Sequence, residues 1–176
     1  MKKWFVLIPC FALILSLVAC SSGQSRDSSE GQITIENGSY SCTPQEFIDM
    51  LNTSALAQED DALLNVSDYV TSGKEIEVGD FHIRFKLYED DNGKLSKMSI
   101  SWNETGMSDE QFHSTNWYIS HMISYLSPEN AKDIFDALGF IGFSEEYYYN
   151  TVTENGSVFD YDVLKSANKL TITPAA

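Results

Sequence analysis

The side chains best able to do acid–base or metal chemistry in this 176-residue chain are its three histidines. His113 and His121 are eight positions apart, which places them about 12 Å apart along one straight helix, too far to share a metal ion. His82 stands two residues from Arg84, whose charge repels a cation. We therefore expect no metal centre, and no sequence feature calls for another cofactor.

Carboxylates could still combine with a histidine into an acid–base site. Two carboxylates and an imidazole in one cleft can protonate a leaving group and activate a water molecule. Glu145, Glu146 and His121 are the group that we consider for such a hydrolase. The sequence lacks the local signatures Gly-x-Ser-x-Gly, His-Glu-x-x-His and Cys-x-x-Cys, and it has no glycine-rich phosphate loop. No catalytic residue is assigned on this basis.

Three consecutive tyrosines, Tyr147, Tyr148 and Tyr149, are the best candidates for a binding surface. In a strand, successive side chains point to opposite faces, so Tyr148 is expected to face away from both neighbours. At least one ring should then lie on the outer surface. With nearby carboxylates such as Glu145, Glu146, Asp160 and Asp162, such a surface suits a glycan, a cationic peptide or a protein. The other interpretation is that these rings belong to a second buried face.

The first twenty residues form a distinct segment. Two lysines follow Met1, and an apolar run then extends from Trp4 to Ala19. A short basic start, a hydrophobic middle and small residues before a cleavage point are typical of a secretory signal peptide. The run is 16 residues long, whereas a membrane span needs roughly 20 predominantly apolar residues, so we interpret it as a signal.

The end of this segment is more specific, because it reads Leu17-Val18-Ala19-Cys20. An aliphatic residue, small residues and a cysteine in this order resemble the lipobox of bacterial lipoproteins. The resemblance implies cleavage before Cys20 and attachment of a diacylglyceryl group to its sulfur. The mature chain would then be lipid-anchored at the extracytoplasmic face of the cell membrane. Two acyl chains suffice for this, because each buried CH₂ contributes about 0.8 kcal/mol.

The segments after the signal differ in composition. Residues 21–31 contain no aliphatic or aromatic side chain and predict a flexible tether. The remaining residues, 32–176, have the usual size of one domain. We therefore expect a signal peptide at 1–19, a lipidated cysteine with its tether at 20–31, and a single extracytoplasmic domain at 32–176.

Cysteine usage gives one further expectation. If Cys10 leaves with the signal and Cys20 is lipidated, Cys42 is the one free thiol of the mature chain. An intramolecular disulfide is then excluded. We expect Cys42 to be a buried small hydrophobe rather than a nucleophile.

The chain is strongly acidic, with 26 acidic residues, all after Cys20, against 11 basic ones. Removal of Lys2 and Lys3 with the signal leaves 9 basic residues and a formal net charge of −17. Such a field repels phosphate backbones, so nucleic acid is not expected as a partner. It also repels anionic headgroups, so we expect membrane contact through the lipid anchor.

Helix signals occur in two groups. Capping boxes at Thr43–Glu46 and Ser108–Gln111 predict two helix starts, and Gly139 predicts the end of a helix that includes Ala131. A further helical piece is expected at about Ala62–Val70. In the helix after Ser108, the predicted buried face consists of Phe112, Ile119, Met122, Ile123 and Leu126. The aromatic residues expected to lie off that face are Trp117, Tyr118 and Tyr125.

Strand signals also occur in two groups. Alternating polarity predicts strands at 74–78, 81–88 and 98–102, and again at 147–153, 158–163 and 169–173. Asp91-Asn92-Gly93 and Asn155-Gly156 predict hairpin turns. The expected fold is α+β, an antiparallel sheet built from two meanders with helix pairs packed on one face. This order resembles β-lactamase-inhibitor-protein-like domains, some of which occur in lipoproteins.

Two functions fit these features. We favour a membrane-anchored extracytoplasmic lipoprotein that acts as a non-enzymatic binding or interaction module for a protein or glycan. Its binding surface would include Tyr147, Tyr148 and Tyr149. The alternative is a cell-envelope hydrolase that uses Glu145, Glu146 and His121.

Overall fold

The computed structural model describes residues 33–53, 66–78, 83–103, 105–140, 144–165 and 167–176, without the side chains of residues 77, 144, 145 and 164. The signal peptide, Cys20 and the tether lie outside the described residues, as does His82. The helix expected at Ala62–Val70 lies partly outside them, and its described part, 66–70, is not helical. For that part the prediction is wrong.

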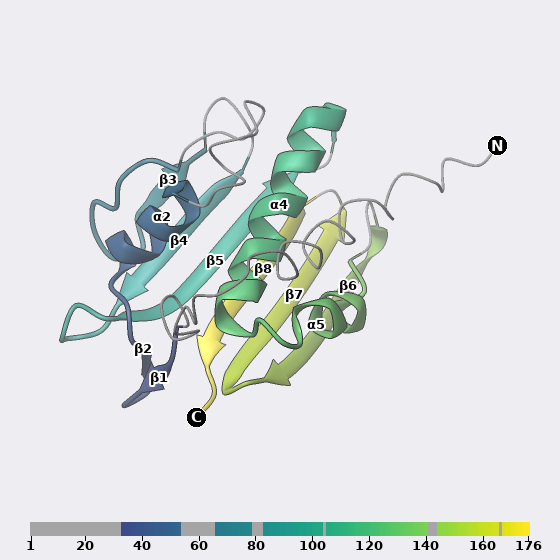
Figure 1. Ribbon diagram of the computed structural model, residues 1–176. Helices are drawn as coiled ribbons and strands as arrows, with labels where there is room; N and C mark the ends of the chain where they lie inside the picture. The colour runs from purple at the N-terminus through teal and green to yellow at the C-terminus, as the bar shows by residue number, and fades with distance from the viewer. Residues whose placement is uncertain (1–32, 54–65, 79–82, 104, 141–143, 166) are drawn as a thin grey trace, which may run out of the picture. The chain divides into compact units, whose positions relative to one another are not determined.

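The described residues form eight strands and three α-helices (Figure 1). In chain order these elements are β1 (Ile35–Glu36), β2 (Ser39–Tyr40), α2 (Pro44–Thr53), β3 (Glu75–Glu77), β4 (Arg84–Glu89), β5 (Leu95–Asn103), α4 (Asp109–Leu126), α5 (Ala131–Leu138), β6 (Ser144–Glu154), β7 (Ser157–Lys165) and β8 (Ala167–Pro174).

Six of the strands form one antiparallel sheet in the order β3-β4-β5-β8-β7-β6, and β1 and β2 form a separate hairpin. The first meander is β3-β4-β5 and the second is β6-β7-β8. The two meanders meet where β5 pairs with β8, with Ile100 opposite Leu170. The predicted fold class, α+β with an antiparallel sheet made of two meanders, is confirmed.

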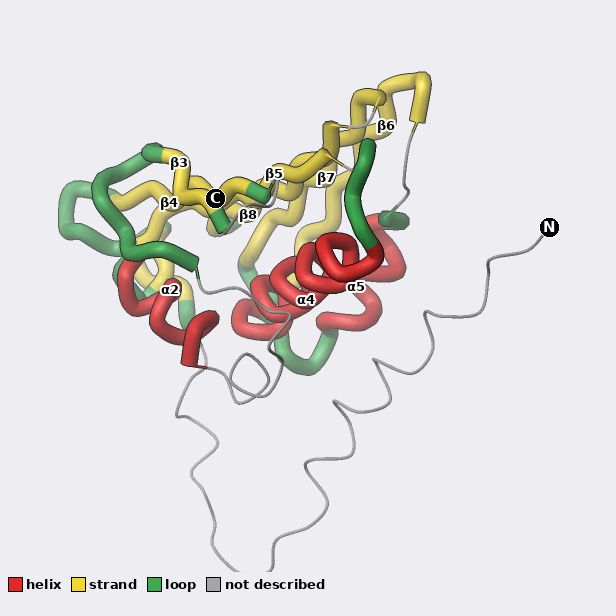
Figure 2. Tube along the Cα trace, turned by 90° about the horizontal axis from the view of Figure 1, so that it is seen from above, coloured by secondary structure: helices red, strands yellow, loops and turns green. Residues whose placement is uncertain are grey.

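The three helices lie on the same side of the six-stranded sheet (Figure 2). We call that side of the sheet the inner face and the opposite side the outer face. Alternate strand residues point to the inner face and are buried: Ile76, Phe85, Leu87, Met98, Ile100, Trp102, Phe159, Tyr161, Val163, Leu170 and Ile172. These side chains and the apolar sides of the helices make the core, so the described helices leave the outer face uncovered.

Both predicted capping boxes are confirmed. At the start of α2, the Thr43 N–H donates to Glu46 Oε2 at 2.7 Å, and the Glu46 N–H donates to Thr43 Oγ1 at 3.2 Å. Ser108 and Gln111 form the same pair of bonds at the start of α4. These bonds satisfy backbone donors that the first helical turn leaves without partners, and each cap stabilises its helix by about 1 kcal/mol.

Two predictions for the buried face of α4 are wrong. Phe112 is 43% exposed, because burial along α4 begins only at Ser114 and the first turn lies beyond the packed part of the helix. Tyr118 is buried, and its ring packs edge-on against Phe85 of β4 with 5.5 Å between centroids. The buried side of α4 is therefore broader than the apolar residues alone predict.

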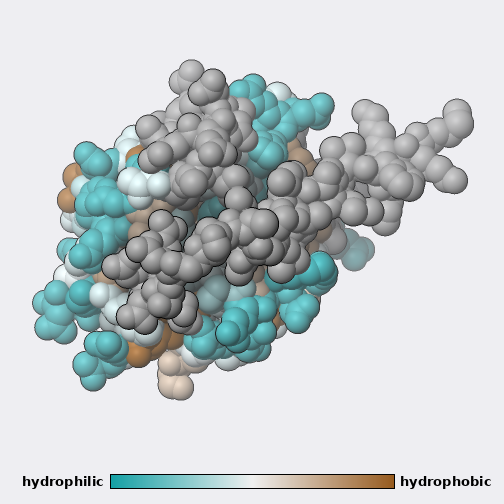
Figure 3. Space-filling view, viewed as in Figure 1, coloured by the Kyte–Doolittle hydropathy of each residue, from teal (hydrophilic) through white to brown (hydrophobic). Residues whose placement is uncertain are grey.

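The described surface on the helix side is mainly hydrophilic (Figure 3). This agrees with a chain whose formal net charge is −15. Within the described ranges, no helix combines the length and the hydropathy needed to cross a bilayer.

Candidate functional site

The three consecutive tyrosines of β6 divide between the two faces of the sheet. Tyr147 and Tyr149 are 61% and 52% exposed, whereas Tyr148 is half-buried and packs against the core. The alternation is as the sequence predicts. Because Tyr148 lies on the inner face, a surface ligand can meet only Tyr147 and Tyr149.

Tyr148 fixes β6 against α5. Its hydroxyl donates to the Leu138 carbonyl oxygen at 3.0 Å, and its ring lies edge-on to Tyr161 with 6.0 Å between centroids. Asn150, on the same side of β6, donates from Nδ2 to the Ala137 carbonyl oxygen at 2.6 Å. These bonds use carbonyl groups at the C-terminal end of a helix, which have no partner within the helix. They hold the strand that presents the outer tyrosines.

Each exposed tyrosine is held by an aspartate of β7. The Tyr147 hydroxyl donates to Asp162 Oδ1, and the Tyr149 hydroxyl donates to Asp160 Oδ1 at 2.9 Å. The two rings are nearly parallel, at 8°, with 6.4 Å between centroids. We call Tyr147, Tyr149, Asp160 and Asp162 the tyrosine–aspartate patch. Thr151 joins it, because its Oγ1 donates to Asp160 Oδ1 at 2.8 Å.

The geometry of this patch follows from the β6–β7 hairpin. Asn155 and Gly156 have φ of 49° and 74°, as the predicted turn requires. The resulting register places Asp162 opposite Tyr149 and Asp160 opposite Thr151. Each tyrosine therefore reaches a diagonal partner, at a spacing of about 7–8 Å that a long side chain can bridge.

Hydrogen bonding also affects the protonation of Tyr147. The bond to Asp162 raises the pKa of Tyr147, since a neutral phenol donates to a carboxylate and a phenolate cannot. The tyrosine hydroxyl remains a donor at neutral pH. The patch thus combines two exposed aromatic rings with two carboxylates.

The charge of the outer face changes sign across the sheet. One row of opposed residues consists of Tyr149, Asp162, Lys169, Ser101 and Arg84. The next row consists of Thr151, Asp160, Thr171, Ser99 and Lys86. At the far end Glu75 pairs with Arg84 at 3.4 Å and with Lys86 at 3.1 Å. The β6–β7 end is therefore acidic and aromatic, whereas the basic residues of these two rows lie on β8 and β4.

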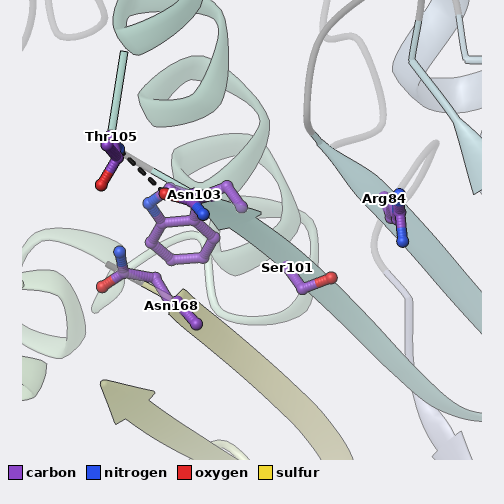
Figure 4. A pocket seen from close by; sticks show the side chains of 7 residues that line it. Arg84, Ser101, Asn103, Thr105 and Asn168 are labelled. Carbon is purple, nitrogen blue, oxygen red and sulfur yellow. Dashed lines mark hydrogen bonds between the residues drawn. The ribbon is translucent and has the colours of Figure 1, made fainter. Parts of the chain in front are cut away.

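A shallow hollow of about 330 Å³ opens at the ends of β5 and β8 (Figure 4). Arg84, Ser101, Asn103 and Asn168 are among the residues that line it, and Asn103 Oδ1 accepts from the Thr105 N–H at 2.9 Å. Among its lining residues in the described chain there is no carboxylate, thiol or imidazole. The described lining offers hydrogen bonds and one guanidinium, and none of its described residues could act as a general base.

His121 lies among aromatic rings. Its ring stacks on Trp117 with 3.8 Å between centroids, lies edge-on to Tyr125 at 6.2 Å, and has Nδ1 2.9 Å from the Trp117 carbonyl oxygen. Burial lowers the pKa of His121, because desolvation disfavours the imidazolium. The histidine is thus a packing residue of α4.

The two glutamates considered with His121 lie on β6. Glu146 is exposed, and the side chain of Glu145 lies outside the described residues. The hydrolase site as a whole therefore stays a prediction. Among the described side chains, no three His, Cys, Asp or Glu residues come together in a way that could hold a metal ion.

Cys42 is a buried thiol, 8% exposed. Burial raises its pKa to about 11, because the thiolate loses its hydration. A thiol of that pKa is protonated at neutral pH and does not act as a nucleophile. This is the packing environment expected from the sequence.

The tyrosine–aspartate patch is the described feature best suited to bind a partner. Comparisons with models of protein families, with curated proteins and with solved structures find no match for this chain.

Proposed function

We propose that this chain is a membrane-anchored extracytoplasmic lipoprotein that acts as a non-enzymatic binding module. The anchor rests on Cys20 at the end of a lipobox-like segment. The binding role rests on the tyrosine–aspartate patch of the outer face.

The observation that carries the binding role is the pair of exposed tyrosines whose hydroxyls are already hydrogen-bonded to β7. An exposed aromatic ring offers a large contact area, and a ring that is held in place loses little conformational entropy when a partner binds. Two such rings side by side expose apolar surface to water, which is unfavourable, and a partner that covers the rings would remove this surface from water. The patch therefore favours a protein or glycan partner.

The binding role is tested by crosslinking and pull-down from intact cells, followed by mass spectrometry. The test variant is Tyr147→Ala/Tyr149→Ala, and the matched control is Phe112→Ala, which removes an exposed ring from α4. We expect the control to retain the partner and the tyrosine variant to lose it. Equal recovery with wild type and tyrosine variant would contradict the proposal.

The anchor is tested separately by metabolic labelling with a palmitate analogue. Wild type and the Cys42→Ala control should be labelled and fractionate with membranes, whereas Cys20→Ala should be unlabelled. Labelling that survives Cys20→Ala would contradict the assignment.

A further inference from the structure

The strand that carries the exposed tyrosines is also an edge of the sheet. In the order β3-β4-β5-β8-β7-β6, the last strand, β6, pairs with β7 on one side, and no described strand pairs with its other side. It is 11 residues long, whereas β3 at the opposite edge has 3. A long edge strand presents a row of backbone donors and acceptors to which another strand can pair.

The hydrogen bonding of β6 identifies the residues that face this free edge. In an antiparallel pair, both backbone groups of one residue point to the partner strand, and those of the next residue point away. The Thr151 N–H donates to Asn150 Oδ1 at 2.9 Å, so Thr151 points away from β7. By the same alternation, Tyr149 and Thr153 present their backbone groups to the free edge.

Edge strands are usually protected by lysine, by proline or by extreme shortness. The sequence of β6, SEEYYYNTVTE, contains three glutamates and no lysine, arginine or proline. Pairing of β6 with its counterpart in a second copy would bring two acidic strands together, which like charges disfavour. A partner strand with basic residues is complementary to this edge.

The tyrosine–aspartate patch extends that complementarity to side chains. A residue of an added strand opposite Tyr149 would have its Cβ about 5 Å from the tyrosine Cβ on the outer face. A lysine or arginine there can reach over the rings of Tyr147 and Tyr149 toward the carboxylates of Asp160 and Asp162. The hydrogen bonds from the tyrosines end on the Oδ1 atoms of these carboxylates, so Oδ2 remains for a cation.

We propose that the free edge of β6 takes up an extended, basic segment of a partner protein as an added strand, with its outward lysine or arginine side chains over the tyrosine–aspartate patch. This inference rests on the proposed binding function and names the class of ligand. Backbone hydrogen bonds supply the pairing, and cation–aromatic contacts with ionic attraction select a basic sequence.

The test uses the full chain in detergent and a fluorescent ten-residue peptide of alternating lysine and threonine. Binding is followed by fluorescence anisotropy. The first comparison is with the same peptide carrying N-methyl groups on its backbone amides, which keeps the charge and removes the backbone donors. We expect the methylated peptide to bind at least tenfold more weakly. Equal affinity would mean general electrostatic attraction and would overturn strand addition.

Protein variants test the edge and the patch independently. Thr151→Pro removes an N–H that faces the free edge and that an added strand would take over from Asn150 Oδ1. Thr151→Val is its matched control, because it also lacks the hydroxyl but keeps that N–H. Asp160→Asn/Asp162→Asn removes the charge of the patch but keeps its acceptor oxygens. We expect Thr151→Pro to bind about tenfold more weakly than Thr151→Val, and the double-asparagine variant to bind about tenfold more weakly than wild type. If Thr151→Pro does not fold, the methylated peptide still decides the question.

The outcomes separate this inference from the proposed function. If the cellular partner is lost with Tyr147→Ala/Tyr149→Ala while the Thr151→Pro and methylated-peptide comparisons show no effect, the binding function stands and strand addition is wrong. Recovery of a glycan instead of a protein would also overturn strand addition. A wild-type dimer in light scattering that Thr151→Pro dissociates would show self-pairing of β6 instead.

Discussion

The three adjacent tyrosines of β6 allow a sharp test of how the two faces of the sheet differ. Tyr147, Tyr148 and Tyr149 share residue type, strand and neighbours in sequence, and they differ in which face they occupy. Replacing each by alanine should therefore destabilise the protein strongly at Tyr148 and weakly at the other two.

The size of the Tyr148 effect follows from its contacts. Partial burial of an aromatic ring contributes about 1 kcal/mol, the edge-on pair with Tyr161 about 1 kcal/mol, and the hydrogen bond to the Leu138 carbonyl about 1 kcal/mol. Tyr148→Ala should thus lower the free energy of unfolding by about 3 kcal/mol. Tyr147 and Tyr149 make their hydrogen bonds at an exposed surface, where water can replace them, so Tyr147→Ala and Tyr149→Ala should remain close to wild type.

Urea unfolding followed by circular dichroism measures the difference. With a denaturant dependence of about 2 kcal/mol per molar urea, Tyr148→Ala should lower the midpoint by about 1.5 M. The two outer variants should shift the midpoint by no more than about 0.3 M. Similar shifts for all three variants would refute the assignment of Tyr148 to the inner face. The result also establishes whether the variants used for pull-down keep their fold.

Three further predictions follow from individual residues. Burial lowers the pKa of His121, so the unfolded chain binds a proton on this imidazole at higher pH than the folded chain does. The free energy of unfolding is therefore highest above the unfolded pKa of about 6.5 and falls as the pH drops below it. His121→Gln should therefore show a flatter decline of the thermal midpoint between pH 7 and pH 5, and an unchanged profile would contradict this reasoning. Because burial raises the pKa of Cys42 to about 11, iodoacetamide at pH 8 should alkylate this thiol at least tenfold more slowly in the folded chain than in urea. Mass spectrometry of the peptide that contains Cys42 measures the two rates, and equal rates would count against burial. Gly139→Ala should lower the free energy of unfolding more than Gly93→Ala does, as measured by urea titration. Both glycines have positive φ, but of the two only an added Cβ at position 139 would meet Tyr148 Oη, at 2.8 Å. Equal losses would show that this close approach is unimportant.

Local features of this fold are readable from the sequence because they depend on neighbouring residues. The capping box at Thr43 needs only a hydroxyl and a carboxylate three residues apart. The turn at Asn155-Gly156 needs two residues that tolerate positive φ. Asn37-Gly38 carries the same signature, with φ of 54° and 80°, and makes the β1–β2 hairpin. We did not predict that hairpin, although its signal is present.

Burial depends on packing partners that are distant in sequence, and there the predictions were weaker. Phe112 has the right angular position on α4 but lies in its first turn, before burial begins. The angular position of Tyr118 on α4 predicts that it lies off the apolar side, yet its ring packs against Phe85 of β4. The pairing of β5 with β8 likewise joins segments about 70 residues apart, which no local pattern specifies.

The candidate site was partly readable for the same reason. Strand alternation separates Tyr148 from its neighbours. The sequence predicts Glu145, Glu146, Asp160 and Asp162 as carboxylates near the tyrosines, and two of the four, Asp160 and Asp162, accept their hydrogen bonds. Which aspartate receives which hydroxyl depends on the hairpin register, since each tyrosine reaches a diagonal partner. Asn150 links β6 to α5 through its hydrogen bond to the Ala137 carbonyl oxygen, and its Oδ1 accepts from the Thr151 N–H. The sequence has no signal for this role, because the role depends on how closely α5 approaches β6.

The position of β8 has a consequence for how the protein matures. The last of the eight described strands in chain order, β8 occupies the middle of the sheet, where it pairs with β5 of the first meander and with β7 of its own. A chain that emerges from its N-terminal end, from the ribosome or through a translocation channel, delivers this strand after all the others. Until β8 arrives, β5 and β7 each lack a neighbour, and the two meanders cannot join. Completion of the sheet is therefore a late step of folding, because it needs a pairing between segments that are distant in the sequence.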